Sequence, residues 1–490
     1  MIWQGERGIK VNTNKWLSKK RVAIMSGISV LILVASFGTK TALDVKTFSQ
    51  SIRENQSTSR TEGAVQALNG DLDILMKISS TPIISQMLSA SGLNFKEIKG
   101  ELSSMIAVAP PLLGNTRPLK YLVSFQNSAE ARGTGGILGA YAVLEFNKGK
   151  ISVIKTGSNA SLYSISLKKI PVDVPNEFLK LYGQNPAILQ NSNLSPHFPY
   201  GAEIWMGLWK EKFGEELDGV IAIDPEALSY LLKATGDITL PSGEKITSSN
   251  IVEETLKNAY KRYETNNDAR KQYLVDILNA TANKIQNGQY SKIEMAKAMK
   301  DAILQNRLLV YSTDKKVEAE LSTSRLGGFM KTDPNNEFRA VIQNIDASKL
   351  DYYLDRKVLI NSTGCKVPKT TQVKVTVKNT LTSGVGLPAY VLTRADKKKP
   401  AELVTGSHRF KVFIYGPVGA RLVSVSRENR IADLGGASTE RKRPIYVADV
   451  DLAPGQSEEL LANFSGGKGR ITFIDQPLVR PTQIKITDKC

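Results

Sequence analysis

One uncharged segment near the N-terminus constrains this chain more than any other feature. Residues 22–39 contain no charged side chain and are mostly apolar. A run of about 18 such residues is just long enough to cross a bilayer as a helix. Basic side chains precede the segment and only Glu6 opposes them: Arg7, Lys10, Lys15, Lys19, Lys20 and Arg21. Because basic flanks stay on the cytoplasmic side, the pattern predicts a transmembrane helix, a cytoplasmic tail at residues 1–21, and an exported body.

The same segment is also compatible with a cleaved signal peptide. Small residues near Ala35 and Ser36 are typical of a cleavage site. The apolar stretch is long for the central region of a signal peptide, which favours an uncleaved anchor. Both interpretations place the body outside the cytoplasmic membrane and argue against nucleic acid as a partner. The predicted localisation is therefore the cell membrane, with a single pass and an extracytoplasmic body.

The body is basic and poor in the residues of common catalytic sites. The chain has 490 residues and a net charge of +18, which favours anionic partners such as lipid headgroups or phosphate-bearing polymers. Cys365 and Cys490 are its two cysteines, so a disulfide framework is excluded and they form either one bridge or two free thiols. His197 and His408 are its two histidines, which argues against a histidine triad and a zinc site.

The pattern of apolar residues and of helix and strand signals changes twice along the exported body. Residues 40–110 have a broken apolar periodicity and are predicted to be helical. Residues 111–350 alternate strand and helix signals, which predicts an α/β (or α+β) sandwich core domain. Expected elements of this domain are strands at 121–125, 141–146, 151–154 and 220–223, a helix opened by Asp224 and Pro225 and closed by Gly236, and a helix over about 268–285.

Residues 351–490 are predicted to form an all-β, immunoglobulin-like sandwich. Alternating strands are expected at 373–377 and 410–414, and turn signals recur between them. The stretch from Arg394 to Arg443 carries twelve basic residues against five acidic ones. This excess indicates either a solvated basic face or a groove for a polyanion.

Residues 126–139 form a glycine-rich segment between two predicted strands. Gly133, Gly135 and Gly136 would let backbone N–H groups approach a phosphate closely, and Arg132 would add a bidentate donor. The structural alternative is a bulged hairpin in which the glycines only satisfy backbone angles.

Two further segments carry candidate site residues. Asp218 and Asp224 flank a predicted strand and could bind a divalent cation, although Asp224 is more economically a helix cap. Residues 260–272 gather tyrosines, acids and cations around a helix start, where Arg262 and Arg270 could face one anion. The alternative for this segment is an ordinary solvated helix start.

Several blocks resemble the domain of unknown function 4012 family. The first block runs from Tyr121 to Tyr141 and includes Phe125-Gln126-Asn127, Glu130, Arg132 and the Gly135-Gly136 pair. The others are residues 218–236, 413–420 and 452–455. The resemblance implies a bacterial envelope protein with an N-terminal anchor, in a family without an established activity.

The order of elements and the run Asp268-x-Arg270-x-Gln272 are also similar to the LytR-CpsA-Psr family of cell-wall glycopolymer ligases. That resemblance implies transfer of an anionic glycan from a polyprenyl-pyrophosphate carrier to peptidoglycan, with arginines and a divalent cation on the pyrophosphate. Two departures stand out. Residues 155–159 replace the family's Pro-Arg-Asp motif, and Asn127 stands where the family has a metal-binding aspartate.

We therefore expect a membrane-anchored envelope protein whose site is a phosphotransferase-like cradle for a pyrophosphate. Such transfer needs charge neutralisation and positioning more than a strong base. Alternatives are a non-catalytic binding protein for an envelope polymer and a scaffold of a surface-assembly or secretion machine. The expected site comprises catalytic Arg132, Arg270 and Asp268, phosphate-binding Arg262, Gly133, Gly135, Gly136 and Gln272, and Glu130 as a ligand of Mg²⁺.

Overall fold

A computed structural model describes most of the chain after residue 116. The described residues are 117–488 except 149, 173–175, 183–184, 363–368, 394–402, 429 and 432–436, together with 66–67, 108, 111–112 and 114. The chain divides into the units Met1–Lys99 and Gly100–Cys490, and the elements below belong to the second unit. The predicted tail, the predicted transmembrane segment, most of residues 40–110 and both cysteines lie outside the described residues. Among the described residues, no helix is long and apolar enough to cross a membrane.

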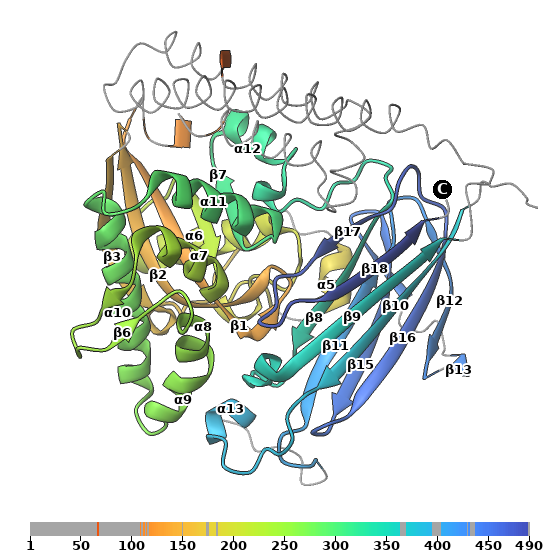
Figure 1. Cartoon of the computed structure of the whole chain (residues 1–490). Coiled ribbons are helices and arrows are strands. Elements are labelled where there is room, and N and C mark those ends of the chain that lie inside the picture. Colours follow the sequence, from red (N-terminus) through yellow and green to blue (C-terminus); the bar gives the residue numbers. More distant parts are fainter. Residues whose placement is uncertain are drawn as a thin grey trace, which may run out of the picture. The chain divides into compact units, whose positions relative to one another are not determined.

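A mixed five-stranded sheet forms the centre of the α/β part (Figure 1). Its strand order is β3-β2-β1-β4-β7. β1 pairs parallel with β4, and the remaining neighbours are antiparallel. The strands are β1 (Leu119–Arg132), β2 (Gly135–Asn147), β3 (Lys150–Ser158), β4 (Gly219–Ile223) and β7 (Leu308–Ser312). The predicted α/β core is thus confirmed, and each of its four expected strands lies within an observed one.

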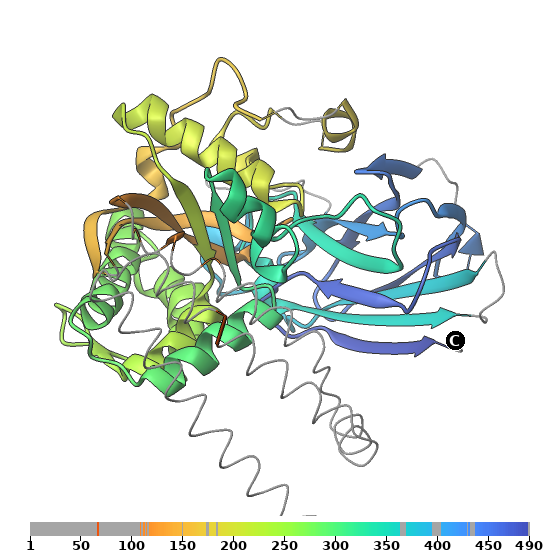
Figure 2. The same cartoon turned by 90° about the horizontal axis from the view of Figure 1, so that it is seen from above.

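Helices cover both faces of this sheet because its central strands are apolar on both sides. Leu122 packs on one face with Trp205 of α6, while Val123 and Phe125 pack on the other face with α7, α10 and α11. Figure 2 shows α6 on one side of the sheet and the green helices on the other. The helices are α6 (Phe198–Phe213), α7 (Pro225–Thr235), α10 (Asn267–Gln286), α11 (Lys292–Leu304) and α12 (Lys315–Leu321).

The helix after β4 begins and ends where its capping residues predict. The Asp224 carboxylate accepts a hydrogen bond from the backbone N–H of Ala227 at 2.8 Å, and Pro225 occupies the first turn. Gly236 follows the helix with φ of +73°, a backbone conformation that favours glycine. The predicted role of Asp224 as a helix cap is therefore confirmed.

The second part of the unit contains two β-sheets that share one apolar core. A six-stranded sheet has the order β13-β12-β16-β10-β9-β18, and a five-stranded sheet has the order β14-β15-β11-β8-β17. Phe338 and Phe410 of one sheet pack with Phe464 of the other in that core. The strands are β8 (Glu337–Asn344), β9 (Leu354–Ser362), β10 (Thr370–Asn379), β11 (His408–Tyr415), β12 (Arg421–Arg427), β13 (Arg430–Ile431), β14 (Ala437–Glu440), β15 (Arg443–Leu452), β16 (Ser457–Ser465), β17 (Thr472–Asp475) and β18 (Gln483–Asp488).

The predicted β-rich region after the core domain is present, but its first strand lies before residue 351, the boundary predicted from the sequence. β8 (Glu337–Asn344) pairs with β11 and β17 and so belongs to this second part. β8 is buried along its whole length, so it lacks the alternation that marks a strand with one solvated face. This uniform burial explains why the sequence pattern assigned β8 to the preceding domain.

A half-buried carboxylate makes the stability of the α/β part dependent on pH. Burial, together with the neighbouring carboxylate of Glu203, raises the pKa of Glu318 on α12 to about 7. Since the folded state binds this proton more tightly, stability should fall as pH rises from the unfolded value of about 4.3 through 7. We expect Glu318→Gln to remove this slope and to stabilise the protein at pH 8 by about 1–3 kcal/mol, measured by urea unfolding at several pH values. The exposed neighbour Glu320→Gln should keep the wild-type slope, and an identical slope in Glu318→Gln would contradict the assignment.

Candidate functional site

A bulge near the end of β1 brings the first group of charged side chains together. Asn127 pairs with Ile137 and Ala131 pairs with Gly136, so the three residues between Asn127 and Ala131 have no partners on β2. A bulge of this kind bends the strand and redirects side chains. Here it brings Glu130 to a lysine that lies more than 200 residues later in the chain.

Glu130 forms a buried ion triad with two cations. Its two carboxylate oxygens accept from Arg132 Nη2 and from Lys349 Nζ, each at 2.7 Å. All three side chains are at most 7% exposed. Arg132 also donates to the backbone carbonyls of Gln190, Ala131 and Asn344. Because its N–H groups are directed at partners within the chain, Arg132 holds segments together and offers little to an external phosphate.

The triad is stable because attraction between its members exceeds the penalty of burial. Burial alone would raise the pKa of Glu130, but Lys349 and Arg132 hold that pKa below its ordinary value. Burial likewise opposes the charge of Lys349, and Glu130 raises the lysine pKa above its ordinary value. All three groups are therefore charged at neutral pH.

A second carboxylate, that of Asp351, binds the same end of β1. Asp351 Oδ2 accepts from the backbone N–H of Ala131 at 2.9 Å and from Asn344 Nδ2 at 2.7 Å. His408 Nε2 lies 3.2 Å from the other oxygen of Asp351, and both side chains are fully buried. His197 is also buried and accepts from the backbone N–H of Met330. The two histidines are thus structural residues rather than surface ones.

The glycine-rich turn packs tightly against its own protein. A Cβ on Gly133 would lie 2.2 Å from the carbonyl oxygen of Leu194, and a Cβ on Gly136 would lie 2.2 Å from that of Asn127. Gly135 has φ of +128°, a conformation that favours glycine. These glycines permit close backbone packing and the tight turn between β1 and β2. The structure therefore gives them a packing role at the positions where the sequence predicted a phosphate loop.

Arg270 lies at the start of α10 beside a pair of aromatic rings. Its guanidinium carbon is 4.5 Å from the ring centroid of Tyr260 and 5.5 Å from that of Tyr390. The two rings stack with centroids 5.9 Å apart, and Asn127 donates to the hydroxyl of Tyr260. Guanidinium groups bind such π-faces by cation–π attraction. The hydrogen bonds of Arg270 go to one neutral acceptor, Oδ1 of Asn267, at 2.7 and 3.1 Å.

Tyr390 connects Arg270 to the ion triad. Lys349 Nζ lies 4.7 Å from the Tyr390 ring while it pairs with Glu130. Tyr163 is 38% exposed as a residue, and burial of its hydroxyl, followed by the charge of Glu130, raises its pKa. We call the set Tyr163, Tyr260, Tyr390, Arg270 and Lys349 the tyrosine–cation cluster.

Arg270 differs from every other buried arginine in the described part of the chain. It is 6% exposed, yet no carboxylate there lies within ion-pair distance of it. The remaining buried arginines each pair with a carboxylate: Arg132 with Glu130, Arg307 with Asp224, Arg339 and Arg443 with Glu337, and Arg356 with Asp475. A buried charge without a counter-ion is unfavourable, so Arg270 is the group that an anionic ligand would complement best.

The remaining predicted site residues lie elsewhere. Arg262 pairs with Glu244 and Glu254 at 2.6 and 2.8 Å and packs on the Tyr273 ring, so its charge is already compensated. Asp268 is exposed in the first turn of α10. Gln272 donates to Asp276 on the solvent side of the same helix. The structure thus brings Arg132 and Arg270 to one region and places Arg262 apart from them.

The environment of Glu130 does not fit the Mg²⁺ ligand predicted there. A divalent cation at Glu130 would meet Arg132 and Lys349, which already neutralise both oxygens. Asp218 binds Arg117 and the backbone N–H of Lys120 instead of a metal. Across the described ranges, no group of three or more His, Cys, Asp or Glu side chains is arranged to hold a metal ion.

Sequence reasoning missed Lys349, Tyr390 and Tyr163. Lys349 and Tyr390 follow β8 and β10, so they join the cluster through the second part of the unit. No local pattern distinguishes them from ordinary surface residues. Tyr260 and Asn267 stood inside the segment singled out around the helix start, where the clustering of tyrosines and cations was a usable signal.

The ion triad leads to a stability prediction. Replacing Glu130 with Gln would leave Arg132 and Lys349 buried and without a counter-charge. We expect Glu130→Gln to lower the free energy of unfolding by about 3–5 kcal/mol at pH 7. Because the pKa of Glu130 is lowered in the fold, the difference from wild type should shrink as pH falls through that pKa. Urea unfolding checks this, with exposed Glu264→Gln as control; a loss no larger than the control's would contradict the role of the triad.

Comparison with solved structures finds weak similarities. Protein gbs0355 from Streptococcus agalactiae is 16% identical, with 44% of this chain and 76% of that chain covered and a TM-score of 0.28. Lin1025 from Listeria innocua is 15% identical, with 45% and 84% covered and a TM-score of 0.23. Aminopeptidase A from Legionella pneumophila is 11% identical, with 26% and 12% covered and a TM-score of 0.14.

No curated protein matches the chain. The model of the family described as "Protein of unknown function (DUF4012)" matches residues 117–260. That range runs from β1 to the tyrosine Tyr260 of the cluster and includes the bulge and the glycine turn. The resemblance seen in the sequence is thereby confirmed over residues 117–260, which match the model of the DUF4012 family.

Proposed function

We propose that this chain is a membrane-anchored, extracytoplasmic envelope protein that binds an anionic cell-envelope glycopolymer at the tyrosine–cation cluster. The observation that carries the proposal is Arg270, a buried guanidinium without a carboxylate partner in the described part of the protein. A phosphate or carboxylate of the polymer would supply the missing counter-charge.

The chemistry around Arg270 suits a phosphate that is attached to a sugar. Arginine binds phosphate oxygens through two parallel N–H groups. Tyr390 is only partly buried and offers ring surface and a hydroxyl beside that cation. Aromatic rings with a polar tip complement ligands that combine apolar C–H faces with hydroxyl groups. The cluster therefore favours an anionic glycan over a bare inorganic ion.

The charge of the whole chain supports the same class of partner. Beyond the predicted cytoplasmic tail, the chain carries 59 basic and 46 acidic residues, and this net charge of +13 attracts polyanions to the surface and speeds their encounter. The expected anchor at residues 22–39 would hold the body at the outer face of the membrane, where envelope polymers are assembled. A binding role without catalysis is consistent with the contacts of Arg132. Its N–H groups are bound within the protein and are therefore not available to a reacting phosphate.

Transfer of the polymer is a second candidate, favoured by the nearness of Lys349 and Tyr163 to Arg270 through Tyr390. In that reaction an acceptor hydroxyl attacks the phosphorus that carries the glycan. The phosphoanhydride bond breaks, polyprenyl phosphate leaves with the electron pair, and the acceptor proton passes to solvent. Incubation with a polyprenyl-pyrophosphate disaccharide and peptidoglycan, with and without Mg²⁺, would detect released polyprenyl phosphate. Binding without release would restrict the protein to the binding function.

Titration of the full chain with inorganic pyrophosphate tests the anion site. We expect Arg270→Gln to weaken pyrophosphate binding about tenfold or more, because the charge-assisted hydrogen bonds are lost. Arg262→Gln is a matched control, since that arginine is already paired with Glu244 and Glu254. Its affinity for pyrophosphate should stay within about twofold of wild type.

The same variants distinguish a binding residue from a structural one. Removing an uncompensated buried charge should leave the free energy of unfolding unchanged or raised, so Arg270→Gln should unfold at no lower urea concentration than wild type. Wild-type affinity for pyrophosphate in Arg270→Gln would refute the proposed function. Strong destabilisation of Arg270→Gln would show that Arg270 mainly supports the fold.

A further inference from the structure

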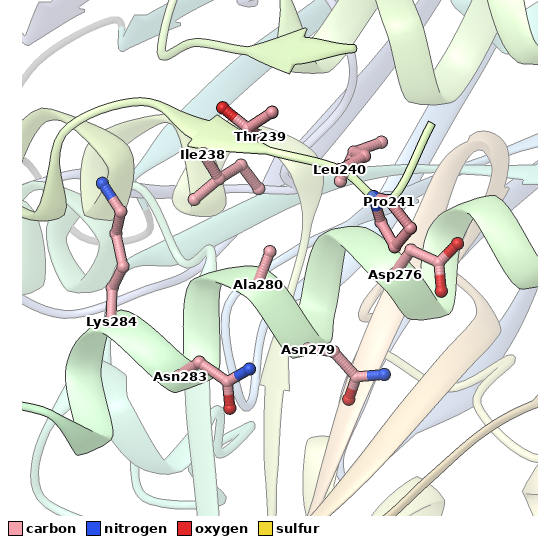
Figure 3. Close-up of a pocket in the computed structure, with 9 residues that line it drawn as sticks. All are labelled: Ile238, Thr239, Leu240, Pro241, Asp276, Asn279, Ala280, Asn283 and Lys284. Atoms are coloured by element: carbon pink, nitrogen blue, oxygen red, sulfur yellow. The ribbon is translucent and has the colours of Figure 1, made fainter. Parts of the chain in front are cut away.

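A second candidate site lies along α10, away from the tyrosine–cation cluster. A groove of about 460 Å³ separates α10 from the short strand β5 (Ile238–Thr239), which pairs with β6 (Lys245–Ile246) (Figure 3). Pockets for small ligands commonly have volumes of about 300–1,000 Å³. We propose that this groove binds a neutral, hydroxyl-rich sugar unit.

One wall of the groove carries polar groups that are free to bind hydroxyls. Asn279 and Asn283 project side by side from α10, and Asp276 lies one turn before Asn279 (Figure 3). The carboxamides of Asn279 and Asn283 form no hydrogen bond with any other described residue. A carboxamide both donates and accepts, as a sugar hydroxyl does. Since α10 rises about 1.5 Å per residue, the two amides lie about 6 Å apart along the helix axis.

The opposite wall presents the exposed residues Thr239 and Pro241. Ile238 and Leu240 anchor this wall, since they are 1% and 4% exposed and belong to the core on this side of the central sheet. Ala280 of α10 points toward this wall, and Pro241 closes one end (Figure 3). Polar groups on one side and a small apolar surface on the other complement a sugar ring, whose hydroxyls lie at its edge and whose C–H groups form its faces.

The charges in the groove argue for a neutral ligand. Lys284 directs its ammonium group to the backbone carbonyls of Thr235 and Asp237, where it caps the C-terminus of α7. Asp276 remains as a carboxylate whose Oδ1 accepts from Gln272. A phosphate placed here would meet this negative charge without a free cation to balance it. The groove and Arg270 therefore suit different parts of a ligand.

The position of the groove links it to the anion site. Arg270 lies in the first turn of α10, and the polar wall begins about six residues later, which corresponds to about 9 Å along the helix. Sugar units separate the phosphates in an anionic glycopolymer, so one polymer could contact both places. This identification of the sugar as part of the polymer rests on the proposed function, whereas binding of a neutral sugar to the groove does not.

Titration of the full chain with the neutral disaccharide N,N′-diacetylchitobiose tests the inference. We expect the wild type to bind this disaccharide. The double variant Asn279→Ala/Asn283→Ala should lose at least about tenfold in affinity, because two amide contacts are lost. Gln286→Ala is the control, because Gln286 is exposed on α10 outside the groove and should leave the affinity unchanged. Ala280→Phe would fill the groove and should abolish binding without removing any polar group.

The outcomes separate this inference from the proposed function. Disaccharide binding that is lost in the groove variants and retained in Arg270→Gln supports the groove as a sugar site. Absence of disaccharide binding to the wild type, unchanged affinity in the groove variants, or preferential binding of an uncharged tripeptide would overturn it. Failure of pyrophosphate to bind would remove the proposed function and leave the sugar site standing.

Discussion

The buried ion triad of Glu130, Arg132 and Lys349 is the interaction on which the described structure most depends. It joins the end of β1 in the α/β part to the segment after β8 in the second part. Burying three charges is costly, and each is compensated only if the others remain in place. The triad therefore requires that the two parts meet in one arrangement, and hydrophobic contacts alone would be less selective.

Other contacts extend this junction along both parts. Gln476 donates to the carbonyl oxygen of Arg132 and exchanges two hydrogen bonds with the backbone of Ile342 in β8. Arg307 pairs with Asp224 and donates to the carbonyl of Leu478. The side chains of Gln476 and Arg307 are thus hydrogen-bonded where the two sets of strands meet, as expected for buried polar groups. A site that draws residues from both parts, such as the tyrosine–cation cluster, is positioned by this network.

The groups around each buried arginine distinguish the arginines that support the fold from Arg270, which is proposed to bind a ligand. A guanidinium group that pairs with a carboxylate and donates its other N–H groups to oxygens within the protein is part of the scaffold, as Arg132 and Arg356 are. Arg270 instead faces aromatic rings and one amide oxygen, which is a weaker environment for a buried cation. This difference in compensation, rather than the presence of arginine, identifies the candidate site.

The sequence alone determined the local elements, because their signals are local. Alternation and apolar runs predicted β1, β2, β3 and β4 and, in the second part, β10 and β11, while Asp224 with Gly236 predicted the ends of α7. Tertiary structure alone decided the site. Arg132 and Arg270 have the same chemistry in the sequence, yet Lys349, which shares Glu130 with Arg132, and Tyr390, which packs on Arg270, come from distant segments. Burial and charge compensation are set by contacts between such segments, so no local pattern can distinguish a paired arginine from the unpaired Arg270.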